Sequence, residues 1–229
     1  YELSFTNILN MLDLAGIPLH AADRGESLAS IVVAGGPCVC NPEPLADFFD
    51  LFIVGEGEEV NLELMDLYRE MKARGAGRRA FLQEAAHIPG IYVPSLYTVA
   101  YHEDGTIREM IPHDGAPQTI QKRIISDLDH AFYPDTLVVP FTETVHDRAV
   151  EEVLRGCLRG CRFCQAGFLY RPFREKSPET INRQCRALCD NTGYQEISLS
   201  SLSTSDHSRL SETLEELLPY TESHRVNLT

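Results

Sequence analysis

The order of predicted strands and helices indicates an α/β protein. Short apolar segments rich in β-branched residues, at 30–34, 50–54 and 196–201, have the character of buried strands, and a helical stretch follows each of them. Strands that alternate with helices favour a parallel, doubly wound, Rossmann-like sheet. The first strands are too few for a complete domain, so we expect a partial sheet near the N-terminus and a second βα series after residue 142.

These elements divide the chain into three expected regions: 1–75, 76–141 and 142–229. In the first, helical periodicity covers residues 4–15 and 59–73. In the second, prolines and glycines are frequent, and the alternation of residues 97–111 about Asp104-Gly105 predicts a β-hairpin. We interpret the second region as a linker that carries this small hairpin.

The third region shows clear starts and stops. Residues 149–154 read as a strand that leads directly into a cysteine-rich loop. Ser177-Pro178 then has the pattern of an N-cap followed by proline at the first helical position. A further amphipathic helix over 210–218 and a strand over 225–228 follow.

Composition and charge exclude several classes of protein. The 20 Lys and Arg residues face 34 Asp and Glu residues, a net charge of −14, which argues against nucleic acid bound over the whole surface. No apolar run reaches the roughly 18 residues that a membrane-spanning helix needs. Seven cysteines without a secretion signal are expected to be thiols or metal ligands in a reducing cytoplasm. The chain begins without Met, so we expect a piece of a longer protein.

The loop at 155–167 carries the strongest chemical signal. Cys157, Cys161 and Cys164 follow the spacing C-x3-C-x2-C, and a short glycine-containing loop can place three thiolates around three corners of an iron–sulfur cube. Three ligands leave one iron open to bind another molecule, which points to chemistry. Five arginines and no acidic residue lie between positions 155 and 174, and these cations offset the negative charge of such a cluster.

Two other interpretations of the cysteines stay open. A zinc site would need a fourth ligand, such as His146 or His207, and inert thiols would need none. The remaining cysteines have weaker patterns. We interpret Cys38 and Cys40 as small side chains, with a second cluster as the alternative, and the helical pair at 185 and 189 as core.

The cysteine loop is where the sequence resembles a known family. Cys157, Cys161 and Cys164, with Phe163 just before the last of them, resemble the signature of radical S-adenosylmethionine (SAM) enzymes. The wider segment 155–178 is similar to radical SAM proteins that carry a cobalamin-binding domain. The resemblance implies a partial, cobalamin-binding type of Rossmann-like sheet followed by the first βα units of a partial TIM-type radical SAM barrel.

The resemblance also implies roles for particular residues. The three cysteines would hold a 4Fe-4S cluster, and its open iron would bind SAM. The backbone near Phe163 would lie against the adenine, and polar groups at the end of the second strand would face the methionine amine. These polar groups are Ser200, Ser201 and Ser203. The strand lacks the Gly-Gly-Glu pattern common in these enzymes, and serines that make local turns are the alternative interpretation.

Two glycine turns follow the predicted N-terminal strands. They are Gly35-Gly36-Pro37 and Gly55-Glu56-Gly57-Glu58. Turns of this kind place ligands at the carboxyl edge of a doubly wound sheet. By the resemblance, Gly35, Gly36, Gly55 and Gly57 would let the backbone approach cobalamin. The Asp-x-His-x-x-Gly motif, whose histidine ligates cobalt in some such domains, is absent from this sequence.

We therefore expect an enzyme that cleaves SAM reductively to a 5′-deoxyadenosyl radical, which acts on an unidentified substrate. Cobalamin-dependent methyl transfer is one expected outcome, and a low-potential flavodoxin or ferredoxin would supply the electron. The alternatives are an RNA-modifying enzyme of the methylthiotransferase type and a non-catalytic iron–sulfur carrier or sensor. A carrier normally saturates its irons with four cysteines, and the three-cysteine loop argues against that.

Overall fold

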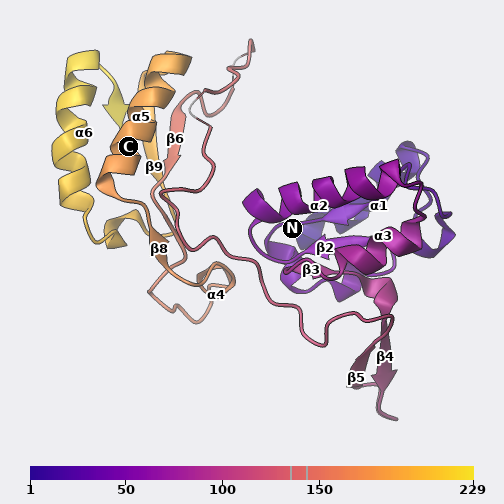
Figure 1. Ribbon diagram of the computed structural model, residues 1–229. Coiled ribbons are helices and arrows are strands. Elements are labelled where there is room, and N and C mark those ends of the chain that lie inside the picture. Colours follow the sequence, from indigo (N-terminus) through magenta and orange to yellow (C-terminus); the bar gives the residue numbers. More distant parts are fainter. Residues whose placement is uncertain (135, 143) are drawn as a thin grey trace. The chain divides into compact units, whose positions relative to one another are not determined.

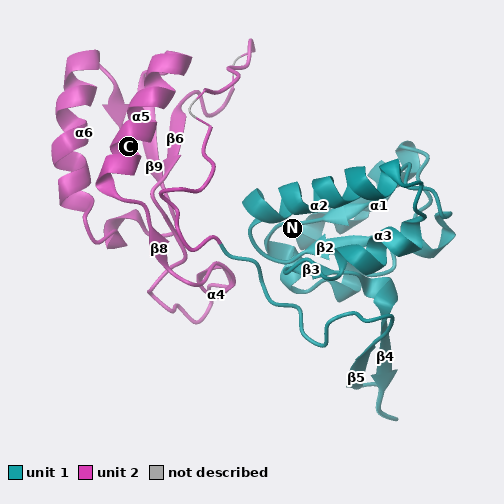
Figure 2. Ribbon diagram, viewed as in Figure 1, with its two compact units in different colours: residues 1–124 teal, residues 125–229 magenta. Residues whose placement is uncertain are grey.

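The computed structural model describes residues 1–134, 136–142 and 144–229, which form two compact units, 1–124 and 125–229 (Figure 2). The first unit extends well beyond residue 75, where we expected the first region to end. It includes a helix and a strand from the expected linker, because both pack into its core. The proposed linker boundary at 141/142 likewise differs from the boundary between the units.

The first unit contains helices and short strands (Figure 1). Its α-helices are α1 (Phe5–Leu14), α2 (Gly57–Ala73) and α3 (Arg78–Ala85). Its strands are β1 (Val33–Ala34), β2 (Leu51–Ile53), β3 (Ile91–Tyr92), β4 (Tyr97–Tyr101) and β5 (Ile107–Pro112). Its 3-10 helices cover Glu2–Ser4, Ala21–Asp23, Pro37–Cys40, Glu43–Leu45 and Pro94–Leu96.

Strands β1, β2 and β3 form a sheet in which β2 and β3 are buried on both faces, whereas β1 is partly exposed. β1 and β2 are parallel, as predicted, whereas β3 runs antiparallel to β2. Because side chains alternate along a strand, Leu51 and Ile53 face the core made with α2 and α3, and Phe52 faces a second core. α1 packs against that second core through Phe5 and Ile8. Helices on both faces match the doubly wound arrangement expected from the sequence.

The predicted hairpin is present as β4 and β5, which pair antiparallel. Its turn follows the local chemistry: Gly105 has a φ of +82°, and the Asp104 carboxylate accepts hydrogen bonds from the backbone N–H (3.0 Å) and hydroxyl (2.7 Å) of Thr106. Gly supplies the left-handed conformation that such a turn needs.

The second unit is a βα series (Figure 1). Its strands are β6 (Ala149–Glu152), β7 (Leu154–Arg155), β8 (Arg174–Glu175), β9 (Glu196–Ser200) and β10 (Asn227–Leu228). Its helices are α4 (Ala166–Leu169), α5 (Pro178–Thr192), α6 (Leu210–His224) and a 3-10 helix over Thr204–Asp206. α5 begins as predicted, with the Ser177 hydroxyl accepting a hydrogen bond from the Thr180 N–H at 3.2 Å.

The winding of the second unit is of the barrel type. β6, β9 and β10 are parallel, with β9 between the other two. α5 and α6 pack side by side against the same face of this sheet, since Leu188 of α5 and Leu217 of α6 share a core with Ile197 of β9 (Figure 1). Right-handed crossovers that proceed in one direction along a parallel sheet place their helices on one face, and a TIM-type barrel continues this pattern around the whole sheet. The described strands form an open sheet, the first part of such a barrel.

Candidate functional site

The cysteine loop, residues 156–173, is an excursion closed at its base. β7 and β8 pair antiparallel on either side of it, with Leu154 opposite Glu175 and Arg155 opposite Arg174. Gly156 is essential to this closure, because its φ is +84° and a Cβ atom there would lie 2.8 Å from the Pro172 carbonyl oxygen. The sequence predicted one continuous strand over 149–154. The structure divides it at Val153, where the chain turns from β6 into this base.

The three predicted cluster ligands lie along the excursion, and all three are free thiols. Cys161 is exposed, and Cys157 and Cys164 are half-buried. Cys157 Sγ accepts the backbone N–H of Arg159 at 3.5 Å, and the Cys164 N–H donates to the Cys161 carbonyl at 3.1 Å. Within the described ranges, no three His, Cys, Asp or Glu side chains converge closely enough to hold one metal ion. Because metal binding couples to folding, a cluster held by these thiols would draw them together as it binds.

The fold brings carboxylates to a loop whose local sequence has none. Arg155 donates two hydrogen bonds to Glu152 at 2.9 and 3.0 Å. Arg159 donates from Nε to Asp206 Oδ2 at 2.7 Å, and its Nη2 contacts the other carboxylate oxygen. Hydrogen bonds from Arg159 and Ser203 lower the pKa of Asp206 below its usual range. The carboxylate is therefore ionised at neutral pH and partly offsets the excess of arginines.

The predicted SAM-facing residues lie at two places in the second unit. Phe163 is 92% exposed at the tip of the excursion. Ser200 ends β9 and is exposed, while Ser201 and Ser203 belong to the turn that follows. The Ser201 hydroxyl lies 2.8 Å from the Thr204 hydroxyl and accepts the Ser203 N–H at 3.1 Å. This supports the local-turn interpretation for Ser201.

The glycine turns of the first unit meet at one edge of its sheet. They follow the carboxyl ends of β1 and β2, which are parallel neighbours in register, with Ala34 opposite Phe52. Gly35 and Gly36 are exposed, and the space where their Cβ atoms would lie is open to at least 4 Å. Gly36 has a φ of +103°, which favours glycine. This turn is free for a ligand to approach its backbone.

The second turn has a different structural role. Gly55 has a φ of +120°, and a Cβ there would lie 2.1 Å from the carbonyl oxygen of Arg123. The Arg123 backbone runs beside the turn: its N–H donates to Val54 O at 2.9 Å, and its carbonyl accepts the Glu56 N–H at 3.0 Å. The side of Gly55 on which a Cβ would lie is therefore occupied by the Arg123 backbone, so approach of a corrin to Gly55 from that side is blocked. Gly57 starts α2, where a Cβ would meet the Asn61 side chain at 2.8 Å.

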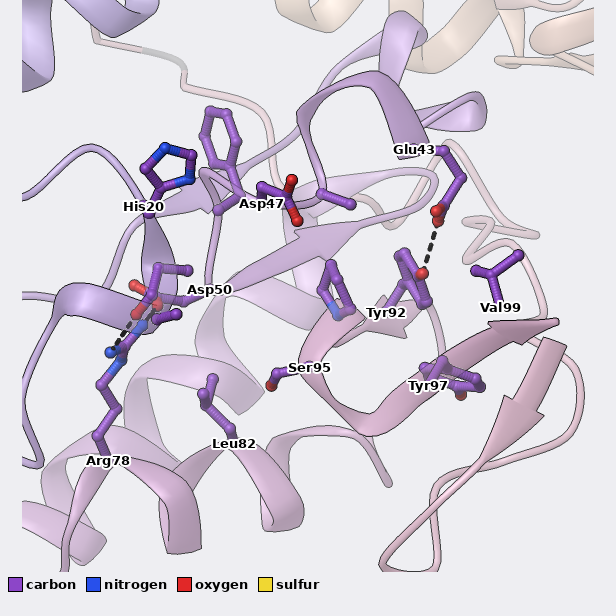
Figure 3. Close-up of a pocket in the computed structure, with 15 residues that line it drawn as sticks. His20, Glu43, Asp47, Asp50, Arg78, Leu82, Tyr92, Ser95, Tyr97 and Val99 are labelled. Atoms are coloured by element: carbon purple, nitrogen blue, oxygen red, sulfur yellow. Dashed lines mark hydrogen bonds and ion pairs between the residues drawn. The ribbon is translucent and has the colours of Figure 1, made fainter. Parts of the chain in front are cut away.

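A cavity of about 420 Å³ lies at the opposite end of β2 and contains none of the predicted site residues (Figure 3). Tyr92 donates a hydrogen bond to the Glu43 carboxylate at 2.6 Å on one side of it. Burial and the neighbouring Glu43 carboxylate raise the pKa of Tyr92, so it remains a neutral donor. Asp50 and Arg78 form an ion pair on the other side (Figure 3).

Buried polar groups are the part of the structure that the sequence did not reveal. Asp50 is fully buried between Arg24 and Arg78, with Arg24 Nη1 at 3.1 Å. In the second unit, the buried Lys176 ammonium donates to Glu151 at 2.7 Å and Gln184 at 2.8 Å. Burial raises the pKa of Glu151, although Lys176 opposes this shift. These partners lie between 8 residues (Lys176 and Gln184) and 28 residues (Asp50 and Arg78) apart in sequence, so no local motif signals them.

Comparison with known proteins gives a family match within the first unit. Residues 1–94 match the sequence model of a family described as radical SAM proteins, N-terminal. This match confirms the resemblance to radical SAM proteins that was predicted from the cysteine loop. An uncharacterized protein of Methanocaldococcus jannaschii is 32% identical over 147 residues, which cover 63% of this chain and 25% of that protein.

Solved structures confirm the fold. TsrM, a radical SAM methyltransferase from Kitasatospora setae, matches 86% of the chain in two structures. The structure with tryptophan substrate and a SAM analogue has a TM-score of 0.53 at 16% identity, and the structure with cobalamin and a [4Fe-4S] cluster has 0.51 at 15% identity. The chain spans about a quarter of the archaeal relative and 36–37% of TsrM. None of the helices in the described residues combines the length and apolar character needed to cross a membrane.

Proposed function

We propose that this chain supplies the cluster-binding and SAM-binding segments of a radical SAM enzyme. The observation that carries the proposal is the cysteine excursion: three free thiols on one loop that is closed at its base and projects from the carboxyl end of a barrel-type strand. Active sites of TIM-type barrels lie at this end of the strands. The match of residues 1–94 to radical SAM proteins supports the same conclusion.

The donor set fits a [4Fe-4S] cluster in number and type. Cys157, Cys161 and Cys164 would hold three irons, and neither a disulfide nor a fourth cysteine occurs in the excursion. When bound, the cluster would bind SAM at its open iron and supply the electron that cleaves SAM to a 5′-deoxyadenosyl radical. Zinc is less well matched, because it requires four ligands.

The other residues of the site would hold the cysteine loop in place or bind SAM. Arg155 and Arg159 hold the loop through their carboxylate partners, and their cationic groups lie close to the thiolates in sequence. Phe163, exposed at the tip, offers an apolar ring for adenine. Ser200 and Ser203 offer hydroxyl groups at the end of β9, whereas Ser201 is engaged in its own turn.

We also propose that the first unit contributes to cobalamin binding. The open turn at Gly35-Gly36 lies at the carboxyl edge of its sheet, where ligands of doubly wound folds bind. TsrM, which has a similar fold, has a structure with cobalamin bound. With cobalamin present, methyl transfer to an unreactive carbon of an unidentified substrate would be the reaction. Titration with hydroxocobalamin, followed by its visible absorption, tests this proposal, and Gly36→Val should weaken binding more than Gly105→Val in the hairpin.

The same chemistry bears on the electron donor and on the compartment in which the protein works. A low-potential protein of the flavodoxin or ferredoxin type would supply the electron. A reducing compartment, the cytoplasm, suits seven free cysteines.

The decisive experiment uses protein reconstituted without oxygen. Iron and zinc content are measured, and the electron paramagnetic resonance (EPR) signal of the dithionite-reduced sample is recorded with and without SAM. We expect about four irons per chain and a signal that changes when SAM is added. Cys161→Ala should abolish that signal, whereas Cys185→Ala, in the core of the same unit, should leave it unchanged. Zinc without iron would overturn the proposal, and a cluster indifferent to SAM would favour an electron carrier.

A further inference from the structure

Three consecutive residues after β9 contact either the cysteine excursion or the chain at its base. Asp206 forms the two-point ion pair with Arg159, which lies between the first two cysteines. The His207 ring lies 2.9 Å, through Nε2, from the carbonyl oxygen of Lys176. Ser208 donates to the Glu175 carboxylate from its N–H at 2.5 Å and from its hydroxyl at 2.6 Å. We name residues 206–208 the clamp segment.

Hydrogen bonds of His207 fix the clamp segment where it meets the residue after β8. His207 is buried, and its Nδ1 accepts the Arg209 N–H at 3.2 Å, which leaves Nε2 as the protonated nitrogen that donates to Lys176. The carbonyl that it contacts belongs to the residue directly after β8. The backbone at Asp206 is therefore fixed relative to the base of the excursion, so its carboxylate approaches the loop from a defined position.

The ion pair itself connects the clamp segment to the cysteine-bearing part of the excursion. The Asp206 side chain is 11% exposed, and it meets the planar guanidinium of Arg159 through both oxygens. Bidentate arginine–carboxylate pairs are more directional and stronger than ordinary surface pairs. The Asp206 backbone N–H also donates to the Ser203 carbonyl at 3.0 Å. One residue thus contacts both the loop of predicted cluster ligands, through its carboxylate, and the turn of predicted SAM-facing serines, through its backbone.

We infer that Asp206 is a positioning residue of the proposed radical SAM site: through Arg159 it fixes the cysteine loop relative to the turn at Ser203. Thiol ligands and SAM-facing hydroxyls come from two different βα loops, so their separation must be set by a contact between those loops. The Arg159–Asp206 pair provides that contact. The inference rests on the proposed function, because the two sets of residues bind one cofactor pair only if the site is of this class.

The first test uses the cofactor-free protein and hydrogen exchange measured by mass spectrometry. Asp206→Asn keeps the size of the side chain and removes its charge. We expect faster amide exchange in peptides covering residues 157–164 and unchanged exchange in β6. Glu70→Gln, which breaks an exposed arginine–glutamate pair of the first unit, is the matched control and should leave the 157–164 peptides unchanged. Unchanged exchange in Asp206→Asn would overturn the inference.

The second test uses reconstituted protein and titrates SAM against the EPR signal of the reduced cluster. We expect Asp206→Asn to retain its iron and to bind SAM about tenfold more weakly, the usual scale for loss of a residue that orients a ligand. Asp206→Glu should recover part of this affinity, and Arg159→Gln should reproduce the loss from the other side of the pair. If Asp206→Asn and Arg159→Gln both bind SAM with wild-type affinity, the inference is overturned and the proposed function is not. Loss of iron or of the SAM response in the wild-type protein would overturn the proposed function as well.

Discussion

Substitution of Gly156 by alanine tests whether the base of the cysteine excursion depends on close backbone packing. Two costs arise at this position. A left-handed φ costs an L-residue about 1–2 kcal/mol, and a Cβ placed 2.8 Å from Pro172 O, 2.9 Å from Phe173 Cα and 3.0 Å from Tyr170 O forces these backbone atoms apart. Overpacking of this kind adds about 1–3 kcal/mol. We expect Gly156→Ala to destabilise the β7–β8 pair by about 2–5 kcal/mol in total.

Gly160→Ala is the matched control for this substitution. Gly160 also has a positive φ, +62°, but the nearest atom to its Cβ position is the flexible end of Arg171 at 3.9 Å. It should therefore incur only the conformational cost of about 1–2 kcal/mol. The assay is hydrogen exchange at the Lys176 amide, which donates to Val153 O at 3.0 Å beside β8. Equal acceleration in the two variants would refute the reasoning, because it would show that packing at Gly156 contributes nothing.

The remaining predictions concern the first unit and the buried thiols. Gly55→Ala should strongly lower the urea concentration at which the first unit unfolds, because its Cβ would lie 2.1 Å from a backbone oxygen. Gly35→Ala should change this midpoint little, because the space at its Cβ position is open. A larger effect of Gly35→Ala than of Gly55→Ala would contradict the packing described. Asp50→Ala should destabilise the protein by about 3–5 kcal/mol, because it leaves two buried arginines without their carboxylate, and a loss below about 1 kcal/mol in urea unfolding would refute this. Burial raises the pKa of Cys185, so its reactive thiolate is scarcer in the folded state. Iodoacetamide should therefore modify the exposed Cys161 and spare the buried Cys185, and mass mapping that finds both modified would contradict the burial.

Local signals predicted local structure well. Ser177 caps α5, and Asp104-Gly105 forms the hairpin turn. Both were predictable because Ser177 and Asp104 bond to residues no more than three positions away in the sequence. The position of α5 and α6 side by side on one face of the sheet also agrees with the barrel that the cysteine-loop resemblance implied. The antiparallel direction of β3 was not predictable, since two residues carry no directional pattern.

The candidate site was predictable in its residues and less so in its contacts. The C-x3-C-x2-C spacing marked the excursion, but Asp206 lies 47 residues from Arg159, and nothing in either local sequence pairs them. The role of Gly55 could not be read from its local sequence for a related reason. A glycine beside a ligand and a glycine beside another backbone segment occur in similar sequences. Only the position of the Arg123 backbone in the structure shows which kind Gly55 is on its Cβ side.

The order of strands in the second unit has a consequence for how this part of the chain folds. β9 pairs with the strand one βα unit before it and with the strand one unit after it, and α5 packs on the strands that flank it. These parallel pairs join residues that are 48 positions apart (Ala149 and Ile197) and 31 positions apart (Ile197 and Leu228), so loop closure must precede each pairing and makes it slow. Each βα unit can dock on its predecessor as it leaves the ribosome, so the cysteine excursion would already be closed at its base while later strands are still being synthesised.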